Sequence, residues 1–121
     1  MENKKAKIKK QETVSVVKQD KIERKYNKTK TKCKVTFFVP GDLAPEAQQV
    51  AVAGTFNNWD QNSHLLTKMD SGDFSLVVEL DSGNDYEFRY VIDGRWWENT
   101  MNADRYIWSE FGNCENMIVS V

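Results

Sequence analysis

The sequence predicts an all-β fold for residues 33–121, an antiparallel sandwich, and three observations lead to it. Several segments alternate apolar and polar residues with a period of two, as strands with one buried face do. Turn-forming Gly, Asn, Asp and Pro separate these segments at intervals of about ten residues, a spacing typical of sandwiches. No segment after residue 33 carries the longer apolar repeat of an extended helix.

A basic N-terminal arm, residues 1–32, precedes this domain. Residues 1–34 hold 13 of the 17 Lys and Arg against four acids, a net charge of +9, whereas residues 35–121 carry four basic and 14 acidic residues, a net charge of −10. All Trp and Phe lie after residue 36, so the arm has too little apolar surface to offset its ordering entropy. We expect it to be largely disordered or weakly helical, with any helix over residues 12–26 frayed.

The charge of the arm indicates what it could contact. A polycation suits an acidic or otherwise anionic partner, and it could equally fold back onto the acidic domain or remain solvated. The lack of interleaved aromatic residues argues against nucleic acid. The N-terminus has no secretory signal and no apolar stretch approaches the roughly 20 residues that span a bilayer. We therefore expect a cytoplasmic protein with Cys33 and Cys114 as free thiols.

The strands follow in order along the chain. They are expected at residues 34–39, 49–54, 65–69, 74–80, 86–92 and 116–121, with residues 99–115 irregular. Pro40-Gly41 ends the first, and Asn57-Asn58 supplies a tight turn after the second. Val50 and Val52 share one face, as do Phe74, Leu76, Val78 and Leu80. Phe56 is expected to lie in the core.

Asp93-Gly94 between two strand-like runs predicts a hairpin with a two-residue type I′ turn. This register places Val91 opposite Trp96, Tyr90 opposite Trp97 and Arg89 opposite Glu98. Because Tyr86, Phe88, Tyr90 and Ile92 form the more apolar face, Trp97 is expected in the core and Trp96 outside. A slip of one residue would exchange the two tryptophans.

An exposed Trp96 beside Arg89 and Glu98 suits a sugar, since the ring covers the apolar face of a pyranose while charged groups bind its hydroxyls. The alternative is that Trp96 only covers the sheet and that Arg89 and Glu98 form an ordinary ion pair. Trp59 has the same two interpretations, sugar stacking or closure of the turn against the sandwich edge.

The sequence argues against catalysis. His64 is the only histidine and the two cysteines are far apart in the chain, which gives no metal-ligand pattern. Glycoside hydrolysis requires two carboxylates roughly 5–9.5 Å apart across a cleft, which a small sandwich seldom offers. No phosphate-binding loop or nucleophile motif is present. We expect no catalytic residue, no cofactor and no metal site.

Three motifs resemble carbohydrate-binding module family 48. They are Gly54-Thr55-Phe56-Asn57-Asn58-Trp59, the run from Tyr86 to Gly94 followed by Trp, and the closing Phe111-Gly112-Asn113-Cys114-Glu115-Asn116-Met117-Ile118-Val119. The family includes N-terminal domains of isoamylases and glycogen branching enzymes and the glycogen-binding domain of the AMP-activated kinase β subunit. The chain is most similar to short bacterial isoamylase early-set domain proteins. The resemblance implies an immunoglobulin-like (early-set) sandwich that binds α-1,4-glucans such as glycogen, starch or maltooligosaccharide.

The resemblance also implies site residues. Trp59 and Trp96 match the sugar-stacking tryptophans, Arg89 the basic residue, Phe111 the apolar residue that enters the glucan ring, and Asn113 a threonine of the last loop; Asn58 and Glu98 lie beside them. Two departures leave alternatives open. Glu115 replaces an asparagine that binds hydroxyls, and Trp97 could be the family tryptophan of this subgroup, as a core residue. The rival interpretation is a protein-interaction or scaffold module with the same fold that has lost sugar binding, with the basic arm contacting an anionic partner. A carbohydrate-active enzyme or an acidic protein is the partner expected for the arm.

Overall fold

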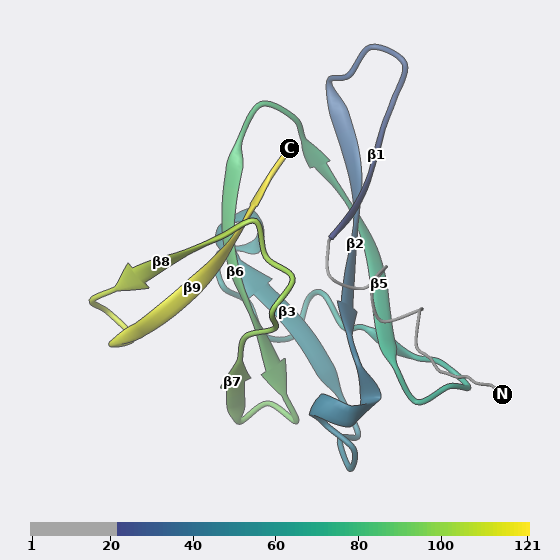
Figure 1. The fold of residues 1–121 in the computed structure, drawn as a ribbon, viewed down its shortest axis with the longest axis vertical. Helices are drawn as coiled ribbons and strands as arrows, with labels where there is room; N and C mark the ends of the chain where they lie inside the picture. The colour runs from purple at the N-terminus through teal and green to yellow at the C-terminus, as the bar shows by residue number, and fades with distance from the viewer. Residues whose placement is uncertain (1–21) are drawn as a thin grey trace, which may run out of the picture.

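The computed structural model describes residues 22–121, which form two antiparallel sheets in a sandwich (Figure 1). The first sheet has the order β1-β2-β5-β4, with bounds Glu23–Tyr26, Lys32–Val39, Phe74–Asp81 and Thr67–Lys68. The second has the order β3-β6-β9-β8, with bounds Val50–Gly54, Asp85–Ile92, Cys114–Ser120 and Arg105–Ser109. β7 (Trp96–Glu98) also pairs with β6. Two short 3-10 turns, η1 (Gly41–Leu43) and η2 (Thr55–Asn57), complete the fold. The two antiparallel sheets confirm the predicted all-β sandwich.

The core lies between the two sheets and uses the faces that alternation predicted. Phe37 of β2 is at its centre, with its ring centroid 5.1 Å from that of Phe88 and 6.5 Å from that of Tyr90. Phe56 stacks on Phe37 at 5.6 Å, which confirms its expected core position. Burial raises the pKa of Tyr90, whose hydroxyl accepts a hydrogen bond from the backbone N–H of Phe38. No helix within residues 22–121 is long and apolar enough to cross a membrane.

The sandwich begins about ten residues before the boundary expected at residue 33. β1 pairs with β2 in antiparallel register, and Ile22 is only 3% exposed in the core. Arg24 donates to the carbonyl oxygens of Ile22 and Ser120 and forms an ion pair with Asp104. Composition did not reveal this strand because the many lysines of residues 1–34 dominate the average of the segment. The strand is held in place by backbone pairing with β2 and by the buried Ile22 that precedes it. Residues 1–21 of the expected arm, and most of its possible helix, lie outside the described residues.

Two further strands differ from the expectation. β8 lies inside residues 99–115, which were expected to be irregular, and its residues are exposed on both faces, so no alternation marked it. Only Thr67–Lys68 of the expected strand at 65–69 pairs as a strand. Cys33 in the first sheet and Cys114 in the second are both free thiols.

The predicted hairpin register was wrong by one residue. The Cα partners are Ile92 with Trp96, Val91 with Trp97 and Tyr90 with Glu98. Asp93 (φ 53°) and Gly94 (φ 68°) adopt the expected positive φ, and the Arg95 N–H donates to the Ile92 carbonyl at 3.0 Å. Arg95 is therefore an extra loop residue, and it exchanges the faces of the two tryptophans.

Packing explains why this register is preferred. Trp97 lies on the outer face of the second sheet against the small side chains of Ala51, Ala53 and Val91. Trp96 remains 51% exposed beside the turn, with the Arg95 guanidinium 4.6 Å from its ring centroid. The expectation that Trp97 is a core residue and Trp96 the outer platform is thus corrected.

Candidate functional site

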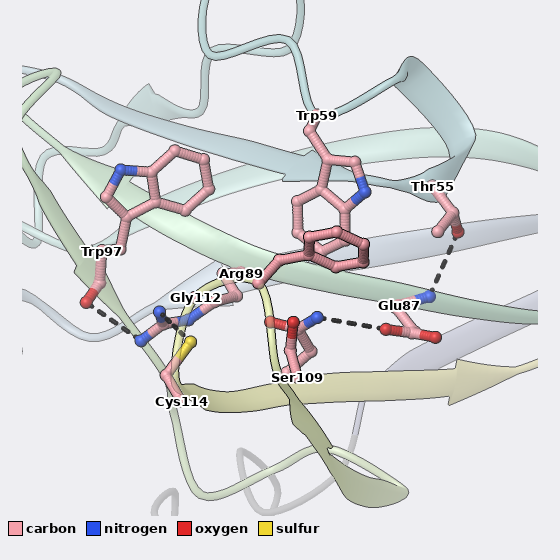
Figure 2. Close-up of a pocket in the computed structure, with 10 residues that line it drawn as sticks. Thr55, Trp59, Glu87, Arg89, Trp97, Ser109, Gly112 and Cys114 are labelled. Atoms are coloured by element: carbon pink, nitrogen blue, oxygen red, sulfur yellow. Dashed lines mark hydrogen bonds between the residues drawn. The ribbon is translucent and has the colours of Figure 1, made fainter.

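A cleft of about 730 Å³ lies on the outer face of the second sheet, a size within the ~300–1,000 Å³ typical of small-molecule sites. Its floor comes from β6, β9 and β8, and its walls from β7, the η2 loop and the β8–β9 turn (Figure 2). The lining residues are Thr55, Trp59, Glu87, Arg89, Trp97, Ser109, Phe111, Gly112, Cys114 and Asn116.

Two indoles form the apolar part of the cleft. The ring centroids of Trp59 and Trp97 are 6.5 Å apart with planes tilted by 43°. Both rings pack on the outer-face cluster of Ala51, Ala53 and Val91, whose short side chains leave room for them. Figure 2 shows the two indoles on the same side of the sheet, with Arg89 between them. Half-buried rings fixed in this way present a rigid apolar surface at little entropic cost.

The η2 loop holds Trp59 in place through Asn57. The Asn57 side chain accepts a hydrogen bond from Gly54 N–H at 2.9 Å and donates to the Val52 carbonyl at 3.1 Å. Asn58 (φ 57°) and Trp59 (φ 60°) both adopt the left-handed region, which is unusual for a residue as bulky as Trp. The roles of the two asparagines in this turn are therefore divided: the Asn57 side chain makes the hydrogen bonds, and Asn58 supplies a positive φ. Strain held by surrounding structure is typical of binding sites.

We expect Asn57→Ala to lower the free energy of unfolding by about 1–3 kcal/mol, because Gly54 N–H and the Val52 carbonyl lose their partner. Chemical denaturation monitored by circular dichroism measures the change. Asn58→Gly is the matched control, since glycine accepts a positive φ, and it should alter stability by only a few tenths of a kcal/mol. Equal losses in both variants would contradict this division.

Arg89 lies in the floor of the cleft and links three strands. Its Nε donates to Asn99 Oδ1 at 2.9 Å, Nη2 to the Trp97 carbonyl at 3.1 Å and Nη1 to Cys114 Sγ at 3.0 Å. Within residues 22–121 it forms no ion pair with Glu98, which lies opposite Tyr90 and is exposed. The fixed guanidinium therefore supplies positive charge to the cleft and holds the backbone of Trp97.

Glu87 and Asn116 form a polar pair in the cleft that sequence reasoning missed. Asn116 Nδ2 donates to Glu87 Oε1 at 3.1 Å, and Asn116 is only 7% exposed. Asn116 Oδ1 and Glu87 Oε2 accept no hydrogen bond from the described residues, so both remain available to a ligand. The sequence does indicate Glu87 as a site residue, because Glu87 precedes Arg89 by two residues on the same strand and therefore lies on the same face.

The register of β9 settles the position of Glu115. Glu115 pairs with Trp108, whereas Cys114 pairs with Ser109 and Asn116 pairs with Ile107. Alternation therefore directs Cys114 and Asn116 into the cleft and Glu115 to the opposite face. Glu115 takes the place of the asparagine expected from the family resemblance, but its side chain does not line the cleft. The cleft still contains an asparagine, Asn116.

The remaining predicted site residues divide between the cleft and its surroundings. Phe111, fully exposed at the β8–β9 turn, lines the cleft together with Trp59 and Arg89. Asn113 adopts φ 53° in that turn and is not a lining residue, nor are Asn58, Trp96 and Glu98. His64 bonds with the Asn57 and Ser63 side chains, and residues 22–121 contain no His, Cys, Asp or Glu cluster able to hold a metal.

Comparison with known proteins identifies similar chains. A family model described as the glycogen recognition site of AMP-activated protein kinase matches residues 43–120, more than half of the sequence. An amylopullulanase of Thermoanaerobacterium thermosulfurigenes is 35% identical over 74 residues, which are 60% of this chain and 3% of that protein. The 1,4-alpha-glucan branching enzyme GlgB of Photobacterium profundum is 39% identical over 46 residues, 37% of this chain and 6% of that protein. GlgB 2 of Xanthomonas campestris pv. campestris is 37% identical over 54 residues, 43% of this chain and 7% of that enzyme. The matched segments are thus a small part of each relative.

Proposed function

Because this chain belongs to the family of glycogen recognition sites of AMP-activated protein kinase, we propose that it is a non-catalytic module that binds α-1,4-glucans in the cleft of the second sheet. The observation that carries the proposal is the pairing of Trp59 and Trp97, two tilted indoles over a polar floor. A curved α-glucan presents pyranose faces at changing angles along the chain, which tilted rings match better than coplanar ones.

The polar groups of the cleft complement the rings. Arg89 offers charged donors, and Glu87 and Asn116 offer free acceptor oxygens for the sugar hydroxyls. Hydroxyls lose their hydration on binding and must find such partners, so a cleft of rings alone would bind sugar poorly. Phe111, at the open side, supplies a third apolar group. The similarity to 1,4-alpha-glucan branching enzymes supports the same class of ligand.

Titration with maltoheptaose, followed by tryptophan fluorescence and by calorimetry, tests the proposal. We expect saturable binding with a dissociation constant in about the micromolar to millimolar range, and none with a β-1,4-linked glucan oligosaccharide of similar length. No response at about 10 mM maltoheptaose would reject the proposal. The dissociation constant would then exceed this concentration, and the binding free energy would be weaker than about 3 kcal/mol.

A second candidate function, contact with an anionic partner, is favoured by the β1–β2 hairpin. Five exposed lysines lie on it: Lys25, Lys28, Lys30, Lys32 and Lys34. Lys32 pairs with Asp81, and Lys25 lies directly opposite Lys34, an arrangement of like charges that an anion would relieve.

We expect the whole chain to bind heparin, used as a generic polyanion, with an affinity that falls steeply as salt rises. Replacing Lys25, Lys28 and Lys30 by Gln should weaken retention on a heparin column, and replacing Lys68 on β4 by Gln should not. If the triple variant elutes from the column at the same salt concentration as the unaltered chain, the hairpin does not contribute to anion binding.

A further inference from the structure

β8 is an exposed apolar strand at the edge of the second sheet. β9 is its neighbour on one side, and the sheet order ends there, which Figure 1 shows as the outer strand of the molecule. Its three central residues are Tyr106, Ile107 and Trp108, with exposed fractions of 39%, 43% and 58%. One side of its backbone therefore offers N–H and C=O groups to a further strand.

The usual protections of an edge strand are lacking in β8. Edge strands are normally shielded by charges, prolines, bulges or a covering segment. β8 has one charged residue, Arg105 at its start, and that side chain forms an ion pair with Asp85. The edge at β3 is covered, because Val52 N–H donates to the His64 carbonyl and Leu66 N–H donates to the Val50 carbonyl. The first-sheet edge strand β1 carries charged residues at its first three positions.

We propose that β8 pairs in antiparallel register with β8 of a second copy of this chain, forming a twofold-symmetric dimer. The strand has five residues, and the register centred on Ile107 pairs all of them. It places Ile107 opposite itself, Tyr106 opposite Trp108 and Arg105 opposite Ser109. Aromatic cross-strand pairs stabilise a sheet by about 0.2–1 kcal/mol each, and the symmetry supplies two of them.

Charge is compatible with this arrangement. No like charges face each other within the paired strands, because Arg105 lies opposite Ser109 and the three central residues are uncharged. Just beyond the strands, Asp104 of each copy lies opposite Glu110 of the other. Asp104, just before the strand, already bonds with Arg24 and with the Ser120 N–H. The self-complementary edge therefore favours a second copy over an unrelated strand.

The dimer would align the two clefts. Ile107 shares the cleft face with Asn116, and Ser109 of the same strand lines the cleft. A twofold axis perpendicular to a sheet leaves both outer faces on the same side. Both clefts would then face the same side of one continuous sheet, so a polysaccharide could occupy both and gain avidity. This consequence rests on the proposed function, whereas the dimer itself does not.

Sedimentation velocity of the whole chain without sugar tests the pairing. Because a single strand pair buries less than a standard interface, we expect the weight-average mass to rise from monomer toward dimer over about 5–500 μM. Ile107→Lys places two lysines against each other at the axis and should keep the protein monomeric at every concentration. Val77→Lys, at a 56% exposed residue within β5 of the other sheet, is the matched control and should still dimerise.

A cysteine cross-link tests the register. Ile107→Cys should form an intermolecular disulfide under mild oxidation, because a residue opposite itself brings the two Cα atoms within about 5.5 Å. Trp108→Cys, whose opposite residue is Tyr106, should cross-link far less. Three results would each overturn the proposal: a monomer at every concentration, a dimer that Ile107→Lys leaves intact, or a Trp108→Cys variant that cross-links more readily than the Ile107→Cys variant.

Discussion

Replacing Trp59 or Trp97 by alanine is expected to weaken maltoheptaose binding by about ten- to a hundredfold, equivalent to roughly 1.4–2.8 kcal/mol. Each indole supplies one face of the apolar cleft, and the rings are only 6.5 Å apart between centroids. Loss of either ring leaves an incomplete apolar surface over the polar floor. Isothermal titration calorimetry of each purified variant measures the effect.

Trp96→Ala is the matched control for this prediction. Trp96 precedes Trp97 on the same strand and is 51% exposed, but it is not a lining residue of the cleft. We expect its affinity for maltoheptaose to stay within about twofold of the unaltered chain. If Trp96→Ala abolished binding and Trp97→Ala did not, the one-residue shift of the hairpin register would be wrong.

The largest effect on stability is expected from Gly54→Ala. A Cβ at this position would lie 2.3 Å from the Glu87 carbonyl oxygen and 2.8 Å from Phe88 Cβ. Since Gly54 of β3 lies opposite Phe88 of β6, the clash can be relieved only by separating β3 from β6. We expect a loss of about 3 kcal/mol or more, which lowers the melting temperature by roughly 12–24 °C in a domain of this size. Differential scanning calorimetry checks it.

Gly83→Ala separates this steric effect from the general cost of replacing a glycine. Gly83 has φ 82°, and no atom lies within 4 Å of the position that an added Cβ would take, so its substitution meets only the left-handed backbone penalty. That penalty is about 1–2 kcal/mol. A Gly54→Ala variant no less stable than Gly83→Ala would contradict the close approach of β3 to β6.

The sequence predicted the two sheets because strands with one buried face alternate apolar and polar residues with a period of two. Val50 and Val52, or Phe88 and Tyr90, alternate with less apolar neighbours and are buried as expected. β1 and β8 show no such alternation. β1 is preceded by one buried residue, Ile22, and β8 is exposed on both faces. These strands form because a neighbouring strand offers backbone partners, a tertiary condition that local pattern does not reveal.

The candidate site was predictable only in part. Trp59, Arg89 and Phe111 could be identified by their motifs and do line the cleft. Trp97 was missed because one extra loop residue, Arg95, reverses the faces of β7, and turn chemistry alone does not set loop length. Asn116 was missed for a similar reason, since its face depends on the pairing of β9 with β8.

The four indole N–H resonances in a ¹H–¹⁵N spectrum, followed during a maltoheptaose titration, test the central claim most directly. Trp59 and Trp97 lie in the cleft, whereas Trp96 and Trp108 lie outside it and serve as internal controls. A glucan bound in the cleft should shift the signals of Trp59 and Trp97 along one saturating curve and leave those of Trp96 and Trp108 in place. Movement of Trp96 or Trp108 with Trp59 and Trp97 unmoved, or no movement at saturating sugar, would contradict it.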